Sequence, residues 1–155
     1  MRVEAKLQEM GIELVTMPNR STGNFIPARR TGNLVYTSGH GAGMPEGGFL
    51  HVGKLGSDLT IEQGYACARQ TMINLLTSLK GEIGDLDKVK QVVKLLCMIN
   101  CAPDFGDTPS VANGASDLLI ELYGDAGRHA RSAVGMGSLP SGMPVEIEMI
   151  VEVED

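Results

Sequence analysis

The sequence predicts a two-layer α+β domain in which two main helices pack on one face of a mixed β-sheet. Three observations support this. Predicted strands and helices alternate along the chain, two apolar helical stripes have clear start signals, and residues 145–153 alternate between apolar and polar side chains. We find no internal repeat, linker or second domain, so residues 1–155 are expected to form a single domain.

The first quarter of the chain contains short elements. In order, we expect a helix at 2–10, a strand at 12–17, a loop at 18–27, a turn at 29–33 whose Gly32-Asn33 pair opens a hairpin, and a strand at 34–38. The helix is predicted because Val3, Leu7 and Met10 recur at helical spacing. Phe25 and Ile26 are apolar for a loop, so we expect them to pack against another part of the molecule.

A glycine-rich stretch follows the strand at 34–38. Residues 39–43 (GHGAG) are similar in composition to a phosphate-binding loop, but they lack its Lys-Ser/Thr ending and the glycine spacing of a dinucleotide site. We therefore expect a flexible strand exit whose glycines let the backbone approach a ligand or a neighbour. The sequence assigns no role to the longer segment Gly41–Gly56.

Two helices are predicted more strongly than any other elements. The first begins at Thr60, which forms a capping box with Gln63, continues along an apolar stripe, and is expected to end at Gly81. The second covers residues 108–123, with Pro109 at its first helical position and its own apolar stripe.

Residues 89–99 are rich in Val, Leu and Ile, and within them Val92 and Val93, then Leu95 to Ile99, are apolar on both faces, which is typical of a strand that is covered on each side. A chain of 155 residues has too few helices to cover both faces of a sheet, so the second cover is expected to be another subunit. This pattern predicts an oligomer.

The candidate site involves the last two extended segments. In residues 145–153 the odd positions are apolar and the even ones are Glu except Ile150, so Glu148 should point away from the core. Arg131 lies in the preceding segment, residues 129–135, between glycine-rich breaks. If the two segments are neighbouring strands, Arg131 and Glu148 can together hold a small carboxylate and a water molecule.

Composition disfavours several classes of function. The net charge of −6 and the pI near 5.0 argue against a phosphate-binding surface, and 4% aromatic residues without Trp make base stacking difficult, so nucleic acid is an unlikely partner. No apolar run reaches membrane-spanning length, and we expect no membrane association. The three cysteines are expected to be buried free thiols in a cytoplasmic protein, without a metal site.

Four motifs together resemble the Rid/YjgF family, whose members were once labelled L-PSP endoribonucleases. They are residues 32–39 (GNLVYTSG), 104–105 (DF), 130–132 (ARS) and 145–148 (VEIE). The resemblance runs from about Phe25 to Val153. It implies a chorismate-mutase-like fold and a homotrimer with sites in the clefts between subunits.

The resemblance also implies a reaction. Family members hydrolyse enamine and imine intermediates of the 2-aminoacrylate and 2-iminopropanoate type to 2-keto acids and ammonia, without a metal or cofactor. Arg131 would then bind the substrate carboxylate, since a guanidinium matches a carboxylate with two parallel hydrogen bonds. Glu148 would orient the attacking water.

Further substrate-binding residues follow from the same resemblance. Ser38 and Gly39 match positions that line the cleft, and Asn113 matches an Asn near a helix start. Two positions depart from the family: Ala133 stands where a Cys is common, and Phe25 stands where a Tyr is frequent.

Simpler interpretations remain beside this one. Arg131 can instead pair with an acidic residue at an interface, and His129, two residues earlier, can tune the site or make a surface hydrogen bond. The whole chain can bind keto acids or other small carboxylates without turnover. Ribonuclease activity is a third hypothesis, which the acidic balance and the lack of a basic groove disfavour.

Overall fold

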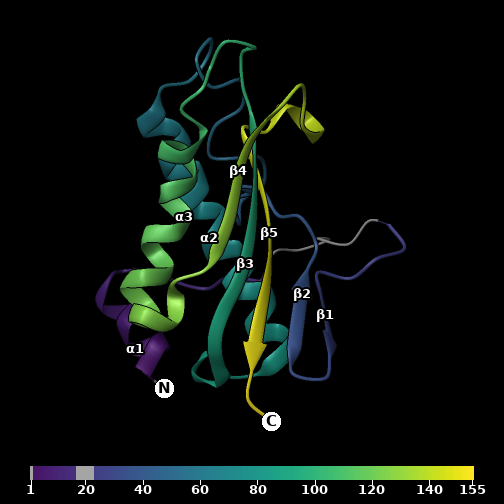
Figure 1. The fold of residues 1–155 in the computed structure, drawn as a ribbon, viewed down its shortest axis with the longest axis vertical. Coiled ribbons are helices and arrows are strands. Elements are labelled where there is room, and N and C mark those ends of the chain that lie inside the picture. The colour runs from purple at the N-terminus through teal and green to yellow at the C-terminus, as the bar shows by residue number, and fades with distance from the viewer. Residues whose placement is uncertain (1, 17–22) are drawn as a thin grey trace.

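The predicted fold class is confirmed by a computed structural model, which describes residues 2–16 and 23–155 (Figure 1). In chain order the elements are α1 (Arg2–Glu9), β1 (Ala28–Thr31), β2 (Leu34–Thr37), α2 (Ile61–Ile83), η1 (Leu86–Lys88), β3 (Val89–Asn100), α3 (Thr108–Tyr123), η2 (Gly124–Gly127), β4 (Ala130–Met136), η3 (Pro140–Gly142) and β5 (Val145–Val153), where η marks a short 3-10 helix. The helices lie on one side of the sheet in Figure 1.

The sheet is mixed, as predicted. Its strand order is β1-β2-β5-β3-β4, with β3 and β4 parallel and the other neighbours antiparallel. The parallel pair requires a crossover, and α3 supplies it. The final strand β5 therefore lies in the middle of the sheet, whereas β4, which carries Arg131, lies at its edge.

The start of α2 is the predicted capping box. The Gln63 backbone N–H donates to Thr60 Oγ1 at 3.2 Å, and the Thr60 N–H donates to Gln63 Oε1 at 2.9 Å. The predicted end at Gly81 is wrong by one turn: the helix continues to Ile83, which is buried, and is capped by Gly84 with φ of +84°. The positive φ, which only glycine adopts readily, therefore lies at Gly84.

The two faces of the sheet differ. On the face toward the helices, Leu95 and Ile99 of β3 are fully buried. On the opposite face Leu96 and Met98 of the same strand are only half-buried, and Val134 of β4 is 41% exposed. The prediction that β3 is apolar on both sides is confirmed, and within one protomer only one side is covered.

Several predictions for the N-terminal third are wrong. Residues 12–16 form no strand: Ile12 and Leu14 pack against the core, but the backbone of this segment pairs with no strand of the sheet. The last residue of the predicted strand, position 17, and residues 18–22 of the predicted loop lie outside the described residues. The hairpin at Gly32-Asn33 is confirmed, but β1 occupies most of the predicted turn. Charged residues are tolerated there because β1 is an edge strand.

Phe25 and Ile26 do not pack into the protomer as expected. They are 53% and 49% exposed, in the loop that leads into β1. The loop is held to the end of β2, where the Ser38 hydroxyl donates to the Ile26 carbonyl at 2.6 Å. Both residues precede β1, which is an edge strand of the sheet.

The glycine-rich segment Gly41–Gly56 is fastened to α2. The buried Asn74 donates two hydrogen bonds of 2.9 Å, to the carbonyls of Gly41 and Gly43. Several backbone N–H groups of the segment are used internally, as between Leu50 and the Ala42 carbonyl. Because these backbone groups bond to one another and to Asn74, the segment does not present a set of free N–H donors to a phosphate.

Two further properties concern the described residues as a whole. No helix among them is both long and apolar enough to cross a membrane. Cys67, Cys97 and Cys101 are all buried free thiols, as predicted. Burial raises the pKa of both Cys67 and Cys97 to about 11, which makes these two thiols poor nucleophiles.

Gly114 of α3 sets the close approach of α3 to α2. A Cβ there would overlap the carbonyl oxygen of Tyr65 and lie 3.1 Å from the Cβ of Ala68. Gly81, on α2, has nothing within 4 Å of the same position and has no positive φ. The same Gly→Ala change should therefore have opposite effects at the two sites.

We predict that Gly114→Ala lowers the free energy of unfolding by about 1–3 kcal/mol through overpacking. Gly81→Ala should raise it by about 0.5–1 kcal/mol through helix propensity. In thermal unfolding followed by circular dichroism, each kcal/mol corresponds to about 2–4 °C for a chain of this size. A Gly114→Ala protein as stable as Gly81→Ala would contradict the packing described for the two helices.

Candidate functional site

Arg131 contacts α3 through one end of its guanidinium group. Its Nη1 donates to Asn113 Oδ1 at 2.8 Å and to Ser116 Oγ at 3.1 Å. Asn113 and Ser116 are three residues apart on α3, so they lie on the same face of the helix. The structure therefore brings together two residues predicted for the site, Arg131 and Asn113, and adds Ser116.

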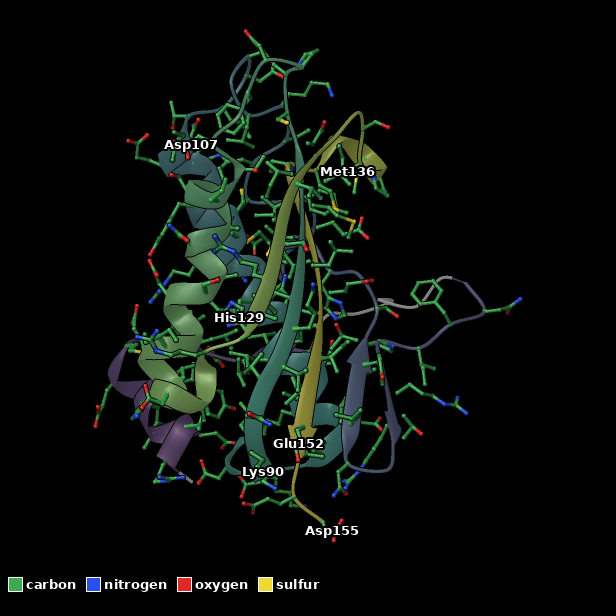
Figure 2. The ribbon with its side chains drawn as sticks, in the orientation of Figure 1. Lys90, Asp107, His129, Met136, Glu152 and Asp155 are labelled. Atoms are coloured by element: carbon green, nitrogen blue, oxygen red, sulfur yellow. The ribbon has the colours of Figure 1, made fainter. Side chains whose placement is uncertain are left out.

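His129 extends this cluster. Its Nε2 lies 2.8 Å from Ser116 Oγ, and its Nδ1 lies 2.7 Å from the carbonyl oxygen of Gly127. Figure 2 shows His129 just before β4, on the side where α3 lies. Burial of the ring lowers the pKa of His129 and so favours its neutral form; the Gly127 carbonyl opposes this, and the nearby Arg131 charge adds to it.

The positive charge of Arg131 has no acidic partner in the described part of the chain. Both hydrogen-bond acceptors on Nη1 are neutral oxygens, and the ion pairs among residues 2–16 and 23–155 do not include Arg131. Nε and Nη2 make no hydrogen bond to these residues. Arg131 is half-buried, so a desolvated cation presents two unused donors.

Ala133 lies on the same face of β4 as Arg131, two residues later. Its side chain packs against the edge of the core, and its carbonyl accepts a hydrogen bond of 2.9 Å from the Thr108 hydroxyl at the start of α3. A methyl group here leaves the backbone geometry intact and supplies no thiol.

A second cluster lies where the chain leaves β2. The Ser38 carbonyl is 2.7 Å from His40 Nδ1, and His40 Nε2 is 2.8 Å from Ser78 Oγ on α2, so the buried ring fixes this exit to the helix. Gly39, next in the chain, has no space for a side chain. A Cβ on it would lie 2.9 Å from the carboxyl carbon of Glu146.

Glu146 is the acidic group that contacts this exit. Burial raises the pKa of Glu146, and the neighbouring charge of Glu148 raises it further. Glu148, the residue chosen from the sequence, is exposed and lines a separate hollow of about 270 Å³ together with Tyr36, Lys94 and Ile150. The geometry therefore favours Glu146 as the acid beside Ser38 and Gly39.

Arg131 and Glu148 are not on neighbouring strands, contrary to the sequence prediction. β3 lies between β4 and β5. Arg131 is in register with Leu95, whose side chain faces the helices, whereas Glu148 is in register with Leu96 on the open face. The two side chains therefore lie on opposite faces of one sheet, and the same holds for Glu146.

The residues missed by sequence reasoning are Ser116 and Glu146. Ser116 could have been found from its spacing of three from Asn113 on a helix. Glu146 and Glu148 both occupy polar positions of the alternating segment 145–153. The sequence pattern therefore could not show which of them lies next to Gly39. Phe25 lies in an exposed loop, next to Ile26, whose carbonyl accepts the hydrogen bond from the Ser38 hydroxyl.

No group of three or more His, Cys, Asp or Glu side chains suited to a metal ion occurs in the described ranges. The two clusters provide a guanidinium, hydroxyls, an amide, two imidazoles and a carboxyl group.

Comparison with known proteins identifies similar chains. Residues 4–151 match the family described as "YjgF/chorismate_mutase-like, putative endoribonuclease". Protein TCP17 of Trypanosoma cruzi is 39% identical over 155 residues, which is 99% of this chain and 96% of that protein.

Solved structures agree with this match. A "putative endoribonuclease" from Shewanella oneidensis superposes with a TM-score of 0.93 at 31% identity, covering 99% of this chain and 100% of that one. RidA from the Antarctic bacterium Psychrobacter sp. PAMC 21119 gives a TM-score of 0.59 at 26% identity, covering 86% and 91%. These similarities confirm the predicted chorismate-mutase-like fold.

The raised pKa of Glu146 predicts a pH-dependent effect on stability. The folded state holds the proton of Glu146 more tightly than the unfolded state, so this residue destabilises the fold increasingly as pH rises above the ordinary Glu value of about 4.3. Glu146→Gln should unfold at a higher temperature than wild type at pH 7, and the difference should vanish below pH ~4.

Glu46→Gln, which removes one charge from an exposed loop residue, controls for the change in net charge. If Glu146→Gln and Glu46→Gln follow the same pH dependence in thermal unfolding, Glu146 is not the desolvated group described above.

Proposed function

Because this chain belongs to the YjgF/chorismate mutase-like family, we propose that it hydrolyses reactive 2-imino acids to 2-keto acids and ammonium. The substrate class is that of 2-iminopropanoate and its enamine form, 2-aminoacrylate. The RidA protein among the similar structures and the retained motifs support this choice.

The observation that carries the proposal is the uncompensated charge of Arg131. A half-buried guanidinium normally pairs with a carboxylate, because desolvating a lone charge is costly. Among the described residues, the acceptors for this group are two neutral oxygens, from Asn113 and Ser116. A substrate carboxylate on Nε and Nη2 would complete the pair with two parallel charge-assisted hydrogen bonds.

Such binding fixes C2 of the substrate next to the carboxylate. Water then adds its oxygen to C2 of the iminium, and a nearby carboxylate accepts the proton released by that water. The same acid returns the proton to nitrogen, and the C–N bond breaks with its electron pair leaving on nitrogen. The carboxylate then transfers the hydroxyl proton on C2 to the departing ammonia, so that the 2-keto acid and ammonium leave. Orientation supplies much of the acceleration, because the imine is intrinsically reactive.

We assign the proton-transfer role to Glu146, with Glu148 as the alternative. A raised pKa brings the carboxyl group closer to the working pH, which suits a group that must both accept and donate a proton. Gly39, which follows Ser38 in the chain, lies beside it, and the absence of a side chain at Gly39 lets the carboxylate approach the backbone. Gly39 and Ser38 would then line the acidic half of the site.

Arg131 and Glu146 lie on opposite faces of the sheet, so one protomer does not join them at one substrate. We propose that the site forms between protomers of a homotrimer, with Arg131 from one and Glu146 from the next. The half-buried apolar side chains on the open face, Leu96 and Met98 with the exposed Val134, support an interface there.

We predict that Arg131→Ala reduces the rate of enzyme-dependent imine loss about 100-fold or more, because two charge-assisted hydrogen bonds are removed. Arg131→Lys, which keeps the charge and loses the planar fork, should retain an intermediate rate. The measurement uses 2-aminoacrylate generated in situ and follows its disappearance.

Wild type and Arg131→Ala with equal rates would remove Arg131 from the mechanism. Binding of a 2-keto acid without any acceleration of imine loss would replace the hydrolase with a carboxylate-binding protein. Metal-free RNA cleavage by wild type that Arg131→Ala abolishes would favour the ribonuclease hypothesis.

A shared site makes a second prediction. Arg131→Ala and Glu146→Gln should each be nearly inactive, yet hetero-oligomers formed from equal amounts of both should regain about one quarter of wild-type activity. That is the chance, roughly one half for each side chain, that a given interface receives both intact groups.

Each variant carried through the same mixing procedure alone is the control. If the hetero-oligomers remain as inactive as the separate variants, the two groups do not meet across an interface. Repeating the mixture with Glu148→Gln in place of Glu146→Gln determines which acid takes part.

A further inference from the structure

We propose that Ser116 and His129 are positioning residues that hold the guanidinium of Arg131 in one orientation for a side-on carboxylate ligand. This inference rests on the proposed function and specifies how its binding group is oriented. It derives from a continuous row of hydrogen bonds that runs from Gly127 through His129 and Ser116 to Arg131.

The donors and acceptors in this row can be arranged in only one way when the ring is neutral. The Gly127 carbonyl can only accept, so His129 Nδ1 carries the ring proton and Nε2 is an acceptor. The Ser116 hydroxyl must then donate to Nε2, 2.8 Å away. Its oxygen keeps lone pairs to accept the N–H of Arg131 Nη1 at 3.1 Å.

The row explains why the serine hydroxyl does not turn away from Arg131. A serine hydroxyl rotates freely unless its proton has a fixed acceptor. His129 Nε2 provides that acceptor, and the half-buried ring is itself held by the Gly127 carbonyl. Burial lowers the pKa of His129, which keeps Nε2 unprotonated and the row intact.

Nη1 has two hydrogens and two acceptors, Asn113 Oδ1 and Ser116 Oγ, so both hydrogens are engaged. A carboxylate that approached the guanidinium end-on would need one hydrogen from each terminal nitrogen, and Nη1 has none left. The remaining N–H groups belong to Nε and Nη2, which form the side-on edge. Asn113 and Ser116 therefore determine which edge of the guanidinium a carboxylate can use.

The first measurement is the tautomer of His129 in the wild-type protein. Long-range ¹H–¹⁵N correlation spectra at neutral pH distinguish a protonated Nδ1 from a protonated Nε2. We expect His129 to be protonated on Nδ1, with Nε2 shifted as an acceptor. A ring protonated on Nε2 would overturn the proposal, because Ser116 would then have no acceptor for its proton.

The second measurement is the affinity for pyruvate, a 2-keto acid product that binds without turnover. Ser116→Ala should weaken pyruvate binding about 5- to 10-fold, as expected for the loss of one typical hydrogen bond. Ser116→Thr keeps the hydroxyl and should stay within about twofold of wild type. In imine hydrolysis, Ser116→Ala should raise KM more than it lowers kcat, because the lost interaction acts on carboxylate binding.

Tyr65→Phe is the matched control. It also removes one hydroxyl that bonds α3, the 2.7 Å contact with Asp117, without contacting Arg131. Its pyruvate affinity should equal that of wild type. Equal affinity of Ser116→Ala and Tyr65→Phe would overturn the proposal, as would a Ser116→Thr protein as weak as Ser116→Ala.

These readouts separate the two claims. If wild type fails to accelerate imine loss but binds pyruvate with the expected dependence on Ser116, the proposed hydrolase activity fails and the positioning role stands. If wild type hydrolyses imines and Ser116→Ala binds pyruvate normally, the activity stands and the positioning role fails. If Ser116→Ala does not fold, the tautomer of His129 and the pyruvate affinity of Ser116→Thr still test the positioning role.

Discussion

The two hydrogen bonds that Arg131 Nη1 makes to Asn113 and Ser116 determine how this molecule can treat a ligand. They engage both hydrogens of Nη1 without neutralising the charge of the guanidinium, since both acceptors are uncharged oxygens. A carboxylate from the described part of the same protomer would have paired with this charge and occupied the edge that a ligand would use. The arrangement instead leaves a half-buried cation with one edge that has no partner among the described residues, and we propose that this edge binds a small anion.

The alternation of β-strands accounts for the second constraint. Residues on β4 and β5 that point to different faces cannot meet, whatever their order in the sequence. Arg131 faces the helices and both candidate acids face the open side of the sheet. The same open side carries half-buried apolar residues of β3. In the proposed trimer, the cationic and acidic groups would meet only across the contact between two protomers.

Much of the fold followed from local patterns in the sequence. The capping box at Thr60, the stripe behind it and the alternation of β5 each involve residues close in the chain, and these predictions are confirmed. Predictions failed where a pattern had two explanations. Ile12 and Leu14 alternate like a strand yet pack as irregular chain, and Gly81 seemed a stop although the helix continues to Gly84.

The candidate site was predicted only in part, and the reason is physical. The resemblance selected Arg131 and Asn113, which do lie together. Strand order was not encoded in the periodicity, so the insertion of β3 between β4 and β5 could not be foreseen. The choice between Glu146 and Glu148 depended on a long-range contact with Gly39, and Ser116 and His129 became informative only once their hydrogen bonds were known.

A crystal structure of the oligomer with a bound 2-keto acid tests the central claim most directly. The account predicts the carboxylate of the ligand on Nε and Nη2 of Arg131, with C2 facing an acidic side chain of an adjacent protomer. A carboxylate from a neighbouring protomer already occupying that edge, or a ligand bound elsewhere with Arg131 untouched, would contradict it.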